Sequence, residues 1–410
     1  MFEECDICVI GGGAAGFFAA LSAASVRTDL RIQILERSEK LLAKVLISGG
    51  GRCNVTHSCR DPKTLSTFYP RGQFFLENAF QHFAVDDTVQ WFRERGVKLK
   101  TEADGRMFPL TDQSETIAQC LKNEAHDLGV KIVTKCAARS IQKQKHGFLL
   151  ETSRGSIHTK NLIVCTGGGA KDSSLEWIRE LGIETTSVVP SLFTFNLAED
   201  PIRELSGVSV PHAAIRIRGN TTYQFGPLLV THWGLSGPAA LRLSAWEARS
   251  LAAKAYHLDL EVDWTGQGDL NQVAEQLRAY AEAHPKKQIV NSRPFPDIPE
   301  RLWQFLCKRV LDRPFRNWAE CGKNLFQALV AQIGAMPAEV KGKTRFKEEF
   351  VTCGGVELSE IDPATCMTIK VPGLFFAGEV MDIDGITGGF NFQAAWTTGY
   401  LSGLAAAKNS

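Results

Sequence analysis

The chain has 410 residues, which is too long for one ordinary domain and fits two or three. Its 46 Lys and Arg residues balance 45 Asp and Glu residues, which argues against a protein that mainly binds nucleic acid or an anionic membrane. We expect neither a targeting nor a membrane-spanning segment, because the first apolar run leads straight into a glycine motif and no run approaches the roughly 20 residues that cross a bilayer. The 11 cysteines are an odd number in apolar contexts, which predicts a reducing, cytoplasmic location.

A glycine motif between a strand and a helix is the strongest local signal in the sequence. Residues 6–10 predict a short buried strand, and residues 17–24 predict a helix. Between them lies the GxGxxG pattern of dinucleotide-binding turns, carried by Gly11, Gly13, Ala14, Ala15 and Gly16. In this pattern the first glycine makes the turn, the second admits a pyrophosphate and the third lets helix and strand pack closely. The helix N-terminus then offers free N–H groups and a positive dipole end to the phosphates.

An acidic residue at the end of the next strand completes this motif. Residues 31–35 predict the strand, and Glu36 follows about 20 residues after the last glycine, as the pattern requires. Its carboxylate would accept hydrogen bonds from both ribose hydroxyls of an adenosine and would repel a 2′-phosphate, which disfavours NADP at this site. We therefore expect Glu36 and the neighbouring Arg37 to contact the adenosine half of a dinucleotide.

A polar loop with three successive glycines is predicted at residues 44–54. Glycines let a loop approach a ligand with its backbone, and Arg52 could pair with a phosphate or with a substrate carboxylate. Cys53 could be a reactive thiol near a helix start, although no partner cysteine stands at disulfide-reductase spacing. The residues expected at the cofactor in this loop are Lys44, Ser48, Gly51, Arg52, Cys53 and Asn54.

A second strand followed by glycines lies in the middle of the chain. Residues 162–165 predict a buried strand that ends in Thr166, Gly167 and Gly168. Flavoproteins with two dinucleotide-binding domains place such a segment beside the adenosine half of FAD. We expect Ala137, after the strand that precedes this one, to lie near the adenine.

The C-terminal part of the sequence adds an element that an NAD dehydrogenase does not need. Residues 374–377 predict a strand followed by Gly378 and Glu379, and Glu379 is placed to bind the ribityl hydroxyls of a flavin. A glycine-rich loop then enters a helix that ends near residue 407, whose N-terminus would stabilise negative charge on the flavin pyrimidine edge. The residues expected there are Gly388, Gly389, Phe390, Asn391 and Ala394. The sequence therefore predicts noncovalently bound FAD.

Together these segments resemble the HI0933-like flavoproteins, also called the YhiN-like or BaiN-like NAD(P)/FAD-dependent oxidoreductases. The strings that carry the resemblance are residues 47–56, 105–109, 231–238, 351–356 and 373–391. The resemblance implies FAD, a Rossmann-type α/β domain built from both chain ends, and an inserted domain with β-barrel-like and helical parts. Residues 167–174 depart from the family's pattern by running almost directly into a helix-like stretch at 175–181, which is typical of a divergent branch.

These implications give a two-domain organisation. We expect a discontinuous FAD-binding domain of residues 1–190 and 345–410, and an insert of residues 191–344. In the insert, residues 191–265 and 334–344 would form the β-rich part and residues 266–333 the helical part. The segments with strand or helix patterns are 213–218, 221–230 and 255–262 for strands, and 271–283, 301–311 and 324–333 for helices.

Bound flavin would carry redox chemistry, so we expect an FAD-dependent oxidoreductase that transfers a hydride between flavin N5 and a small or medium organic substrate. Because no second GxGxxG motif is present, either NAD(P)H docks transiently at the flavin or a substrate such as an amine reduces the flavin and oxygen reoxidises it. Two other classes stay open. One is an RNA-associated flavoprotein, which the basic run at residues 341–347 would support and the neutral overall charge opposes; the other is a flavin-binding protein without turnover.

Few side chains are candidates for catalysis. They are Arg52, Cys53 and His232, and the last belongs, with Trp233 and Ser236, either to the substrate site or to a turn shaped by nearby glycines. Neither a Ser-His-Asp arrangement nor metal-ligand spacing is present, so we expect no metal. The expected partner is a small-molecule substrate, and the charge balance argues against nucleic acid.

Overall fold

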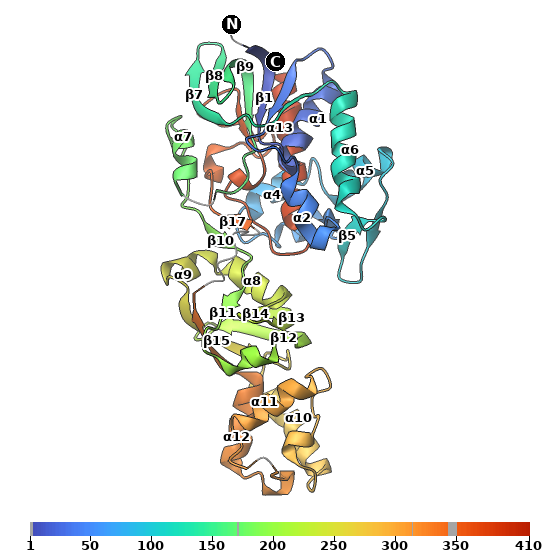
Figure 1. Ribbon diagram of the computed structural model, residues 1–410, viewed down its shortest axis with the longest axis vertical. Helices are drawn as coiled ribbons and strands as arrows, with labels where there is room; N and C mark the ends of the chain where they lie inside the picture. Colours follow the sequence, from blue (N-terminus) through green and yellow to red (C-terminus); the bar gives the residue numbers. More distant parts are fainter. Residues whose placement is uncertain (1–2, 170–171, 314, 343–350) are drawn as a thin grey trace. The chain divides into compact units, whose positions relative to one another are not determined.

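The computed structural model describes residues 3–169, 172–313, 315–342 and 351–410 (Figure 1). The chain divides into two compact units, which are Met1–Val189 with Val351–Ser410 (unit 1) and Pro190–Phe350 (unit 2). Unit 1 therefore contains both ends of the chain. Strands β10 (Val189–Ser191) and β17 (Val351–Cys353) lie where the chain passes from one unit to the other.

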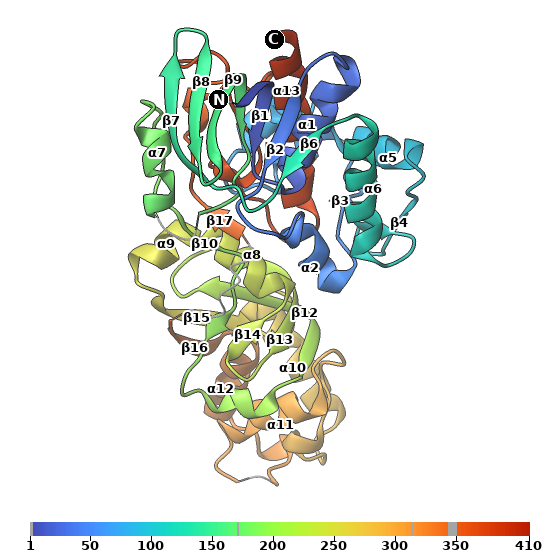
Figure 2. The same ribbon diagram turned by 45° about the horizontal axis from the view of Figure 1, so that its top comes forward.

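Unit 1 is built on a seven-stranded sheet (Figure 2). Its strands are β1 (Glu3–Ile10), β2 (Ile32–Leu35), β6 (Lys131–Val133), β7 (Ala138–Gln144), β8 (Gly147–Thr152), β9 (Gly155–Val164) and β18 (Leu374–Phe376). They follow the order β6-β2-β1-β9-β8-β7, and β18 also pairs with β9. The pairs among β6, β2, β1, β9 and β18 are parallel, whereas β7 and β8 are antiparallel. The parallel strands end at one edge, so the segments that follow them lie close together.

Burial on both faces explains the apolar runs of the central strands. Ile7 and Val9 in β1 and Ile163 in β9 have no exposed surface, as expected for parallel strands covered on both sides. Helix α1 (Ala14–Val26) packs against the sheet and against α13 (Phe390–Lys408), which explains why its residues 15–24 are all buried. A helix that is apolar on every side is stable when it is buried on every side.

The rest of unit 1 consists of shorter elements. Its other helices are α2 (Ala43–Gly51), α3 (Pro62–Ser66), α4 (Gln73–Ala79), α5 (Val85–Glu94), α6 (Ser114–Asp127) and α7 (Glu176–Arg179). A small antiparallel sheet has the order β3-β5-β4 and consists of β3 (Thr56–His57), β4 (Leu99–Thr101) and β5 (Arg106–Pro109).

Unit 2 contains a six-stranded antiparallel sheet in the order β11-β14-β13-β12-β15-β16. The strands are β11 (Phe195–Asn196), β12 (Ser209–Ile217), β13 (Gln224–Val230), β14 (Gly234–Ser236), β15 (His257–Asp263) and β16 (Met336–Lys341). Burial alternates along β16, so one face of the sheet packs on a core. The N–H of Asn196 donates to the carbonyl of Gly342 at 3.3 Å, which brings the two end strands together as a nearly closed barrel.

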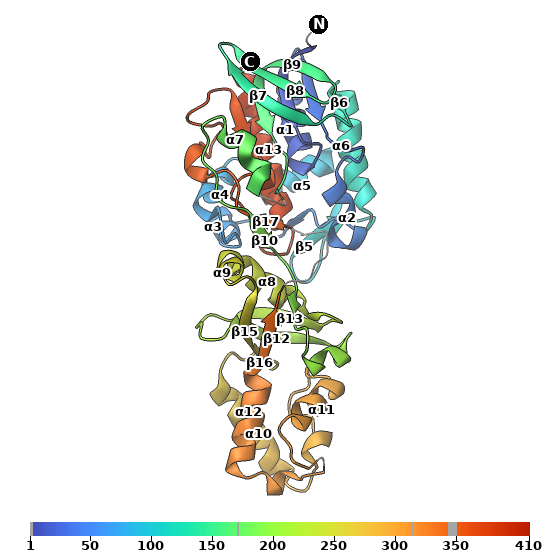
Figure 3. The same ribbon diagram turned by 60° about the vertical axis from the view of Figure 1, so that its left-hand side comes forward.

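Helices complete unit 2. They are α8 (Pro238–Trp246), α9 (Ala248–Ala253), α10 (Leu270–Ala283), α11 (Glu300–Lys308) and α12 (Lys323–Gly334). Helices α10, α11 and α12 form a bundle at one end of the barrel-like sheet, and α12 leads directly into β16 (Figure 3). The fold class expected from the sequence is therefore confirmed: a Rossmann-type domain from both chain ends carries an inserted barrel-like and helical part.

Two segments differ locally from the sequence expectations. Residues 44–51 were expected as a loop, but the segment begins as helix α2, whose Val45 side chain packs into the core. The helix is then kinked, with Ser48 extended and Gly49 and Gly50 at positive φ. The helix predicted at 175–181 is reduced to a 3₁₀ turn, Asp172–Leu175, and the single turn α7. Among the described residues, none of the helices combines the length and apolarity that crossing a bilayer requires.

Candidate functional site

The turn between β1 and α1 is fixed by main-chain contacts. Gly11 has a φ of +115°, and a β-carbon there would lie 2.2 Å from the carbonyl oxygen of Cys165, just after β9. A β-carbon on Gly16 would lie 1.9 Å from the carbonyl oxygen of Gly11. At Gly13, the N-cap of α1, no described atom lies within 4 Å of the equivalent position, and no described side chain caps the helix. The N-terminus of α1 is thus uncapped beside open space, as an anion-binding helix end must be.

The carboxylate of Glu36 is held at the end of β2 by two backbone N–H groups. Gly12 donates to Oε2 at 2.9 Å, and Ser38 donates to Oε1 at 2.8 Å. The N–H of Cys136 donates to the carbonyl of Glu36 at 2.9 Å, so Ala137 follows directly after a residue bonded to Glu36. The acidic residue and the adenine-side segment expected from the sequence are therefore neighbours.

Glu379 joins segments that are far apart in the sequence. Its Oε1 accepts a hydrogen bond from the N–H of Thr352 at 2.8 Å, and its Oε2 lies 2.6 Å from Nζ of Lys44. Gly168 lies against the same carboxylate, because a β-carbon on it would be 2.5 Å from Oε1. The Glu379 side chain is 18% exposed, so the carboxylate is fixed but reachable. Sequence reasoning missed Thr352, although it stands in the family string at residues 351–356.

Side chains hold the loop before α13. Gly389, the N-cap of this helix, has a φ of +94°, and no described side chain caps the helix end itself. The amide of Asn54 accepts from the N–H of Gly389 at 2.9 Å and donates to the carbonyl of Thr56 at 3.1 Å. The amide of Asn391 bonds both the N–H and the carbonyl of Gly385, at 2.8 and 2.9 Å. The N-terminus of α13 is therefore a second uncapped positive helix end in unit 1.

Arg52 is committed to neighbours within unit 1. Its Nη1 lies 2.6 Å from Oε1 of Glu102 and 3.5 Å from Oδ1 of Asp112, and its guanidinium lies 3.9 Å from the ring centre of Phe108. A guanidinium with these partners is oriented by the small sheet of β3, β4 and β5. Its side chain keeps 33% of its exposure, which suits contact with a bound molecule.

The other two candidate catalytic residues lie in different environments. Cys53 is completely buried, and burial raises the pKa of its thiol to about 12, so the thiol stays protonated at neutral pH and is not a reactive nucleophile. His232 lies in unit 2, on the exposed turn between β13 and β14. The remaining residues predicted at the cofactor lie on the segments of unit 1 described above, and they are Ala14, Ala15, Arg37, Ser48, Gly51, Thr166, Gly167, Gly378, Gly388, Phe390 and Ala394. Within the described ranges, no group of three or more His, Cys, Asp or Glu side chains could hold a metal ion.

A family model described as the Rossmann domain of HI0933-like proteins matches residues 5–405. The chain belongs to this family. Curated relatives of this HI0933-like protein include a 3-dehydro-bile acid Δ4,6-reductase of Clostridium scindens, 26% identical with 98% of each chain covered. They also include a ribosomal RNA dihydrouridine synthase of Escherichia coli K12, 28% identical with 100% of each chain covered.

Solved structures show the same fold at low identity. A 3-ketosteroid Δ1-dehydrogenase of Sterolibacterium denitrificans is 13% identical, covers 100% of both chains and has a TM-score of 0.53. A 3-ketosteroid Δ4-(5α)-dehydrogenase of Rhodococcus jostii RHA1 is 14% identical, with 99% of this chain and 97% of that chain covered and a TM-score of 0.51. By its family, the HI0933-like protein is an FAD-dependent oxidoreductase. Its fold contains the Rossmann-type FAD-binding domain.

Proposed function

We propose that this HI0933-like protein is an FAD-dependent reductase that saturates a carbon–carbon double bond conjugated to a carbonyl group. The observation that carries the proposal is that unit 1 combines two kinds of group. It has two helix N-termini that no described side chain caps, and it has two carboxylates held in place just after strands. Two positive helix ends suit the two electron-rich parts of FAD, which are its pyrophosphate and the pyrimidine edge of its flavin.

Each part of FAD has a group suited to it in unit 1. The N-terminus of α1 beside Gly13 would bind the pyrophosphate, and Glu36 would accept hydrogen bonds from the adenosine ribose. Glu379, with Lys44 beside it, would bind the ribityl hydroxyls. The N-terminus of α13 at Gly389 would lie at the pyrimidine edge. The residues therefore fit the cofactor that the family implies.

When bound, FAD supplies a hydride donor and acceptor at N5 of its flavin. Saturation of a conjugated double bond adds a hydride to the β-carbon and a proton to the α-carbon of the substrate. The chain contributes binding and orientation, and the positive end of α13 favours negative charge on the pyrimidine edge. We propose NAD(P)H as the transient reductant, because the sequence has no second dinucleotide-binding motif for a resident one.

The names of the relatives support this type of bond. A bile acid Δ4,6-reductase and a dihydrouridine synthase both add hydrogen across a double bond. In a 3-oxo-4,6-diene and in uracil, that double bond is conjugated to a carbonyl group. The chemistry common to both relatives is therefore reduction of an electron-poor alkene.

A uridine in ribosomal RNA is the second candidate substrate. Two curated relatives, from Escherichia coli K12 and Haemophilus influenzae, carry that activity in their names, each 28% identical with 100% of both chains covered. In the helical part of unit 2, Lys286, Lys308 and Lys323 are exposed, and no ion-pair partner stands beside them within the described ranges. Lys341, from the basic run that suggested RNA, is instead paired with Glu199 at 2.9 Å, and residues 343–347 of that run lie outside the described residues.

The test is anaerobic rapid mixing of the purified protein with NADH or NADPH, followed by an acceptor. Bleaching of the oxidised flavin absorbance by either nucleotide is the expected first result. The reduced protein is then mixed with a steroid 4-en-3-one or with an in vitro transcribed ribosomal RNA, and product is identified by a mass gain of two hydrogens. Reoxidation by the enone with a saturated product supports the steroid-like class, and dihydrouridine in the RNA supports the second candidate.

Two results would overturn the proposal. A preparation that neither contains FAD nor takes it up would remove the cofactor on which the proposal depends. Flavin that is bleached by an amine and reoxidised by oxygen, but by neither conjugated acceptor, would assign the protein to the oxidase class instead.

The matched control for the RNA candidate is the Lys286→Glu and Lys308→Glu double variant, which should weaken turnover of RNA and leave that of the enone unchanged.

A further inference from the structure

A segment after α3 holds the loop that leads into α13 at several points. The carbonyl of Phe68 accepts from the N–H of Ile386 at 3.0 Å, and Oη of Tyr69 donates to the carbonyl of Phe390 at 2.6 Å. Beside these two contacts, Arg71 pairs with Asp384 through an antiparallel backbone bridge. We call residues 68–72 the clamp and residues 383–389 the loop. Neither the GxGxxG motif nor the strand-and-acid motifs of the sequence point to the clamp.

The ion pair between Arg71 and Asp384 is the charged contact of the clamp, and it is largely buried. Nε of Arg71 lies 2.5 Å from Oδ1 of Asp384, and a second bond joins Nη2 to Oδ2, so the pairing is two-pronged. The side chain of Arg71 is 11% exposed and that of Asp384 is completely buried. A buried carboxylate requires a partner of opposite charge, and the planar guanidinium fixes its orientation as well as its charge. Arg71 therefore sets the position of Asp384 within the loop.

The position of the loop decides where the N-terminus of α13 lies. Asp384 precedes Gly389, the N-cap of α13, by five residues, and the intervening backbone is tied at Gly385 by Asn391. The carbonyl of Phe390, in the first turn, is held by Tyr69. A shift of Asp384 would therefore move the same N–H groups that form the positive end of the helix.

We propose that Arg71 is a positioning residue for the flavin. Through Asp384 it fixes the loop and thereby sets both the affinity for FAD and the reduction potential of the bound flavin; this inference rests on the proposed FAD site. Arg71 also cancels the buried negative charge of Asp384 near the helix end. Without this cancellation, the carboxylate would oppose negative charge on the reduced flavin and lower its potential.

The experiment compares Arg71→Met, Arg71→Lys and the double variant Arg71→Met with Asp384→Asn. For each, the flavin is removed, and FAD affinity is measured by quenching of flavin fluorescence on reconstitution; the midpoint potential is measured by equilibration with a redox dye. We expect Arg71→Met to bind FAD at least about tenfold more weakly and to have a lower midpoint potential. Arg71→Lys keeps the charge without the two-pronged geometry. Its FAD affinity should therefore fall, whereas its midpoint potential should stay close to that of the natural protein.

The double variant and a matched control separate positioning from general stability. In the double variant no charge is left buried, so the potential should return toward that of the natural protein while the affinity stays reduced. The control is Arg95→Met, which removes a partly buried pair with Glu124 at 2.7 Å between α5 and α6. It should lower the thermal midpoint without changing FAD affinity or potential. If Arg71→Met does not fold, Arg71→Lys and the double variant provide the same comparison.

The outcomes distinguish this inference from the proposed function. A natural protein that takes up no FAD would overturn the proposed function and this inference with it. A natural protein that binds FAD, with Arg71→Met and Arg71→Lys unchanged in affinity and potential, would overturn the positioning role alone. Equal effects of Arg71→Met and Arg95→Met on both quantities would also overturn it, because the change would then follow from stability.

Discussion

The two helices that begin at the proposed cofactor site are anchored in different ways. Helix α1 starts at a turn shaped by main chain against main chain: Gly16 packs on Gly11, and Gly11 packs on the residue after β9. Helix α13 starts at a loop held by side chains from other segments, among them Asn54, Tyr69 and Arg71. Both helix ends are uncapped by any described side chain, so both can face a ligand.

The difference shows how one sheet edge can combine a rigid and an adjustable element. A turn made of close main-chain contacts accepts almost no side chain at its glycines. Its geometry is therefore the same wherever the motif occurs. A loop held by side chains can be tuned by substitutions in segments hundreds of residues away. We therefore expect substitutions at α1 to decide whether FAD binds, and substitutions around α13 to grade how tightly it binds and at what potential.

The largest effect should separate two glycines of the same motif. A side chain on Gly16 would start 1.9 Å from a carbonyl oxygen, so Gly16→Val should prevent folding of unit 1. A side chain on Gly13 meets no described atom within 4 Å, so Gly13→Val should fold and yet block the pyrophosphate position. Circular dichroism and flavin content of the purified proteins measure the two effects. A Gly13→Val protein with full flavin content would show that the phosphates do not lie there.

The next effect should come from Asn54, whose amide bridges Thr56 and the N-cap Gly389. Asn54→Ala leaves two polar backbone groups without this partner, which should cost about 2–3 kcal/mol of unfolding free energy. FAD affinity should fall with it, because Asn54 positions Gly389, the N-cap at the helix end. Urea unfolding of the apoprotein and FAD titration measure the two quantities. An unchanged affinity would separate the loop from the cofactor.

The same contrast explains which parts of the site the sequence could predict. Glycines at fixed spacing, an apolar strand before them and Glu36 after the next strand are local patterns, and the structure brings Gly12 and Glu36 into contact as expected. The central strands could be predicted from apolar runs and the insert helices from apolar periodicity, because burial determines both patterns.

Contacts of the α13 loop could not be predicted in this way. Nothing in the local sequence of Tyr69 or Arg71 indicates a partner more than 300 residues later. The burial of Cys53, a candidate for a reactive thiol by its place near a helix start, was likewise not visible in the local sequence: after the kink within α2 its side chain lies in the core. Motif chemistry predicts residues that contact a ligand through the backbone better than residues that position a loop.

A smaller effect is expected from the hydroxyl of Tyr69. Tyr69→Phe keeps the buried ring and removes the 2.6 Å hydrogen bond to the carbonyl of Phe390. The loss should be about 1–2 kcal/mol of unfolding free energy, with a change in FAD affinity below that of Asn54→Ala. Thermal and urea unfolding with FAD titration check it. An affinity loss exceeding that of Asn54→Ala would reverse the order in which we place the two contacts.

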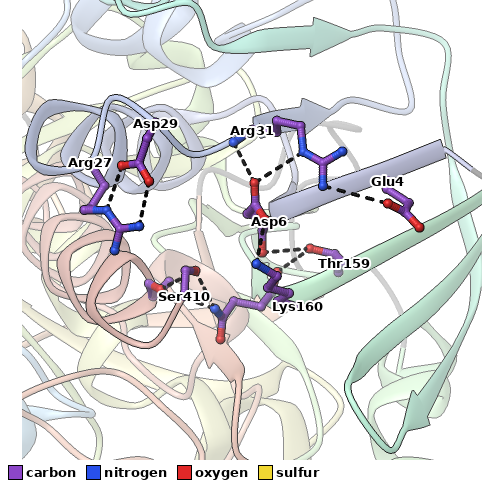
Figure 4. Close-up of polar contacts among 10 residues, drawn as sticks. Glu4, Asp6, Arg27, Asp29, Arg31, Thr159, Lys160 and Ser410 are labelled. Carbon is purple, nitrogen blue, oxygen red and sulfur yellow. Dashed lines mark hydrogen bonds and ion pairs between the residues drawn. The ribbon is translucent and has the colours of Figure 1, made fainter.

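The smallest effect should arise at Asp6, in the N-terminal half of β1, whose carboxylate lies beside Arg31 and Lys160 (Figure 4). Burial raises the pKa of the Asp6 carboxyl, but hydrogen bonds from the N–H of Arg31 at 2.9 Å and the nearby Lys160 ammonium, also at 2.9 Å, outweigh it, so the pKa lies below its ordinary value. A carboxyl with a depressed folded-state pKa stabilises the protein above its unfolded-state pKa of about 4. That contribution is lost as the pH falls through the folded-state value.

Asp6→Asn should therefore lower the unfolding free energy at neutral pH and leave FAD affinity unchanged. The difference between the natural protein and the variant should shrink as the pH falls below about 4, because the natural carboxyl becomes neutral as well. Urea unfolding across this pH range, on the apoprotein, measures the difference. A gap that stays constant into acid would mean that Asp6 acts through packing or uncharged hydrogen bonds. A change in FAD affinity would mean that the two ends of β1 are coupled, in conflict with the independent anchoring of α1.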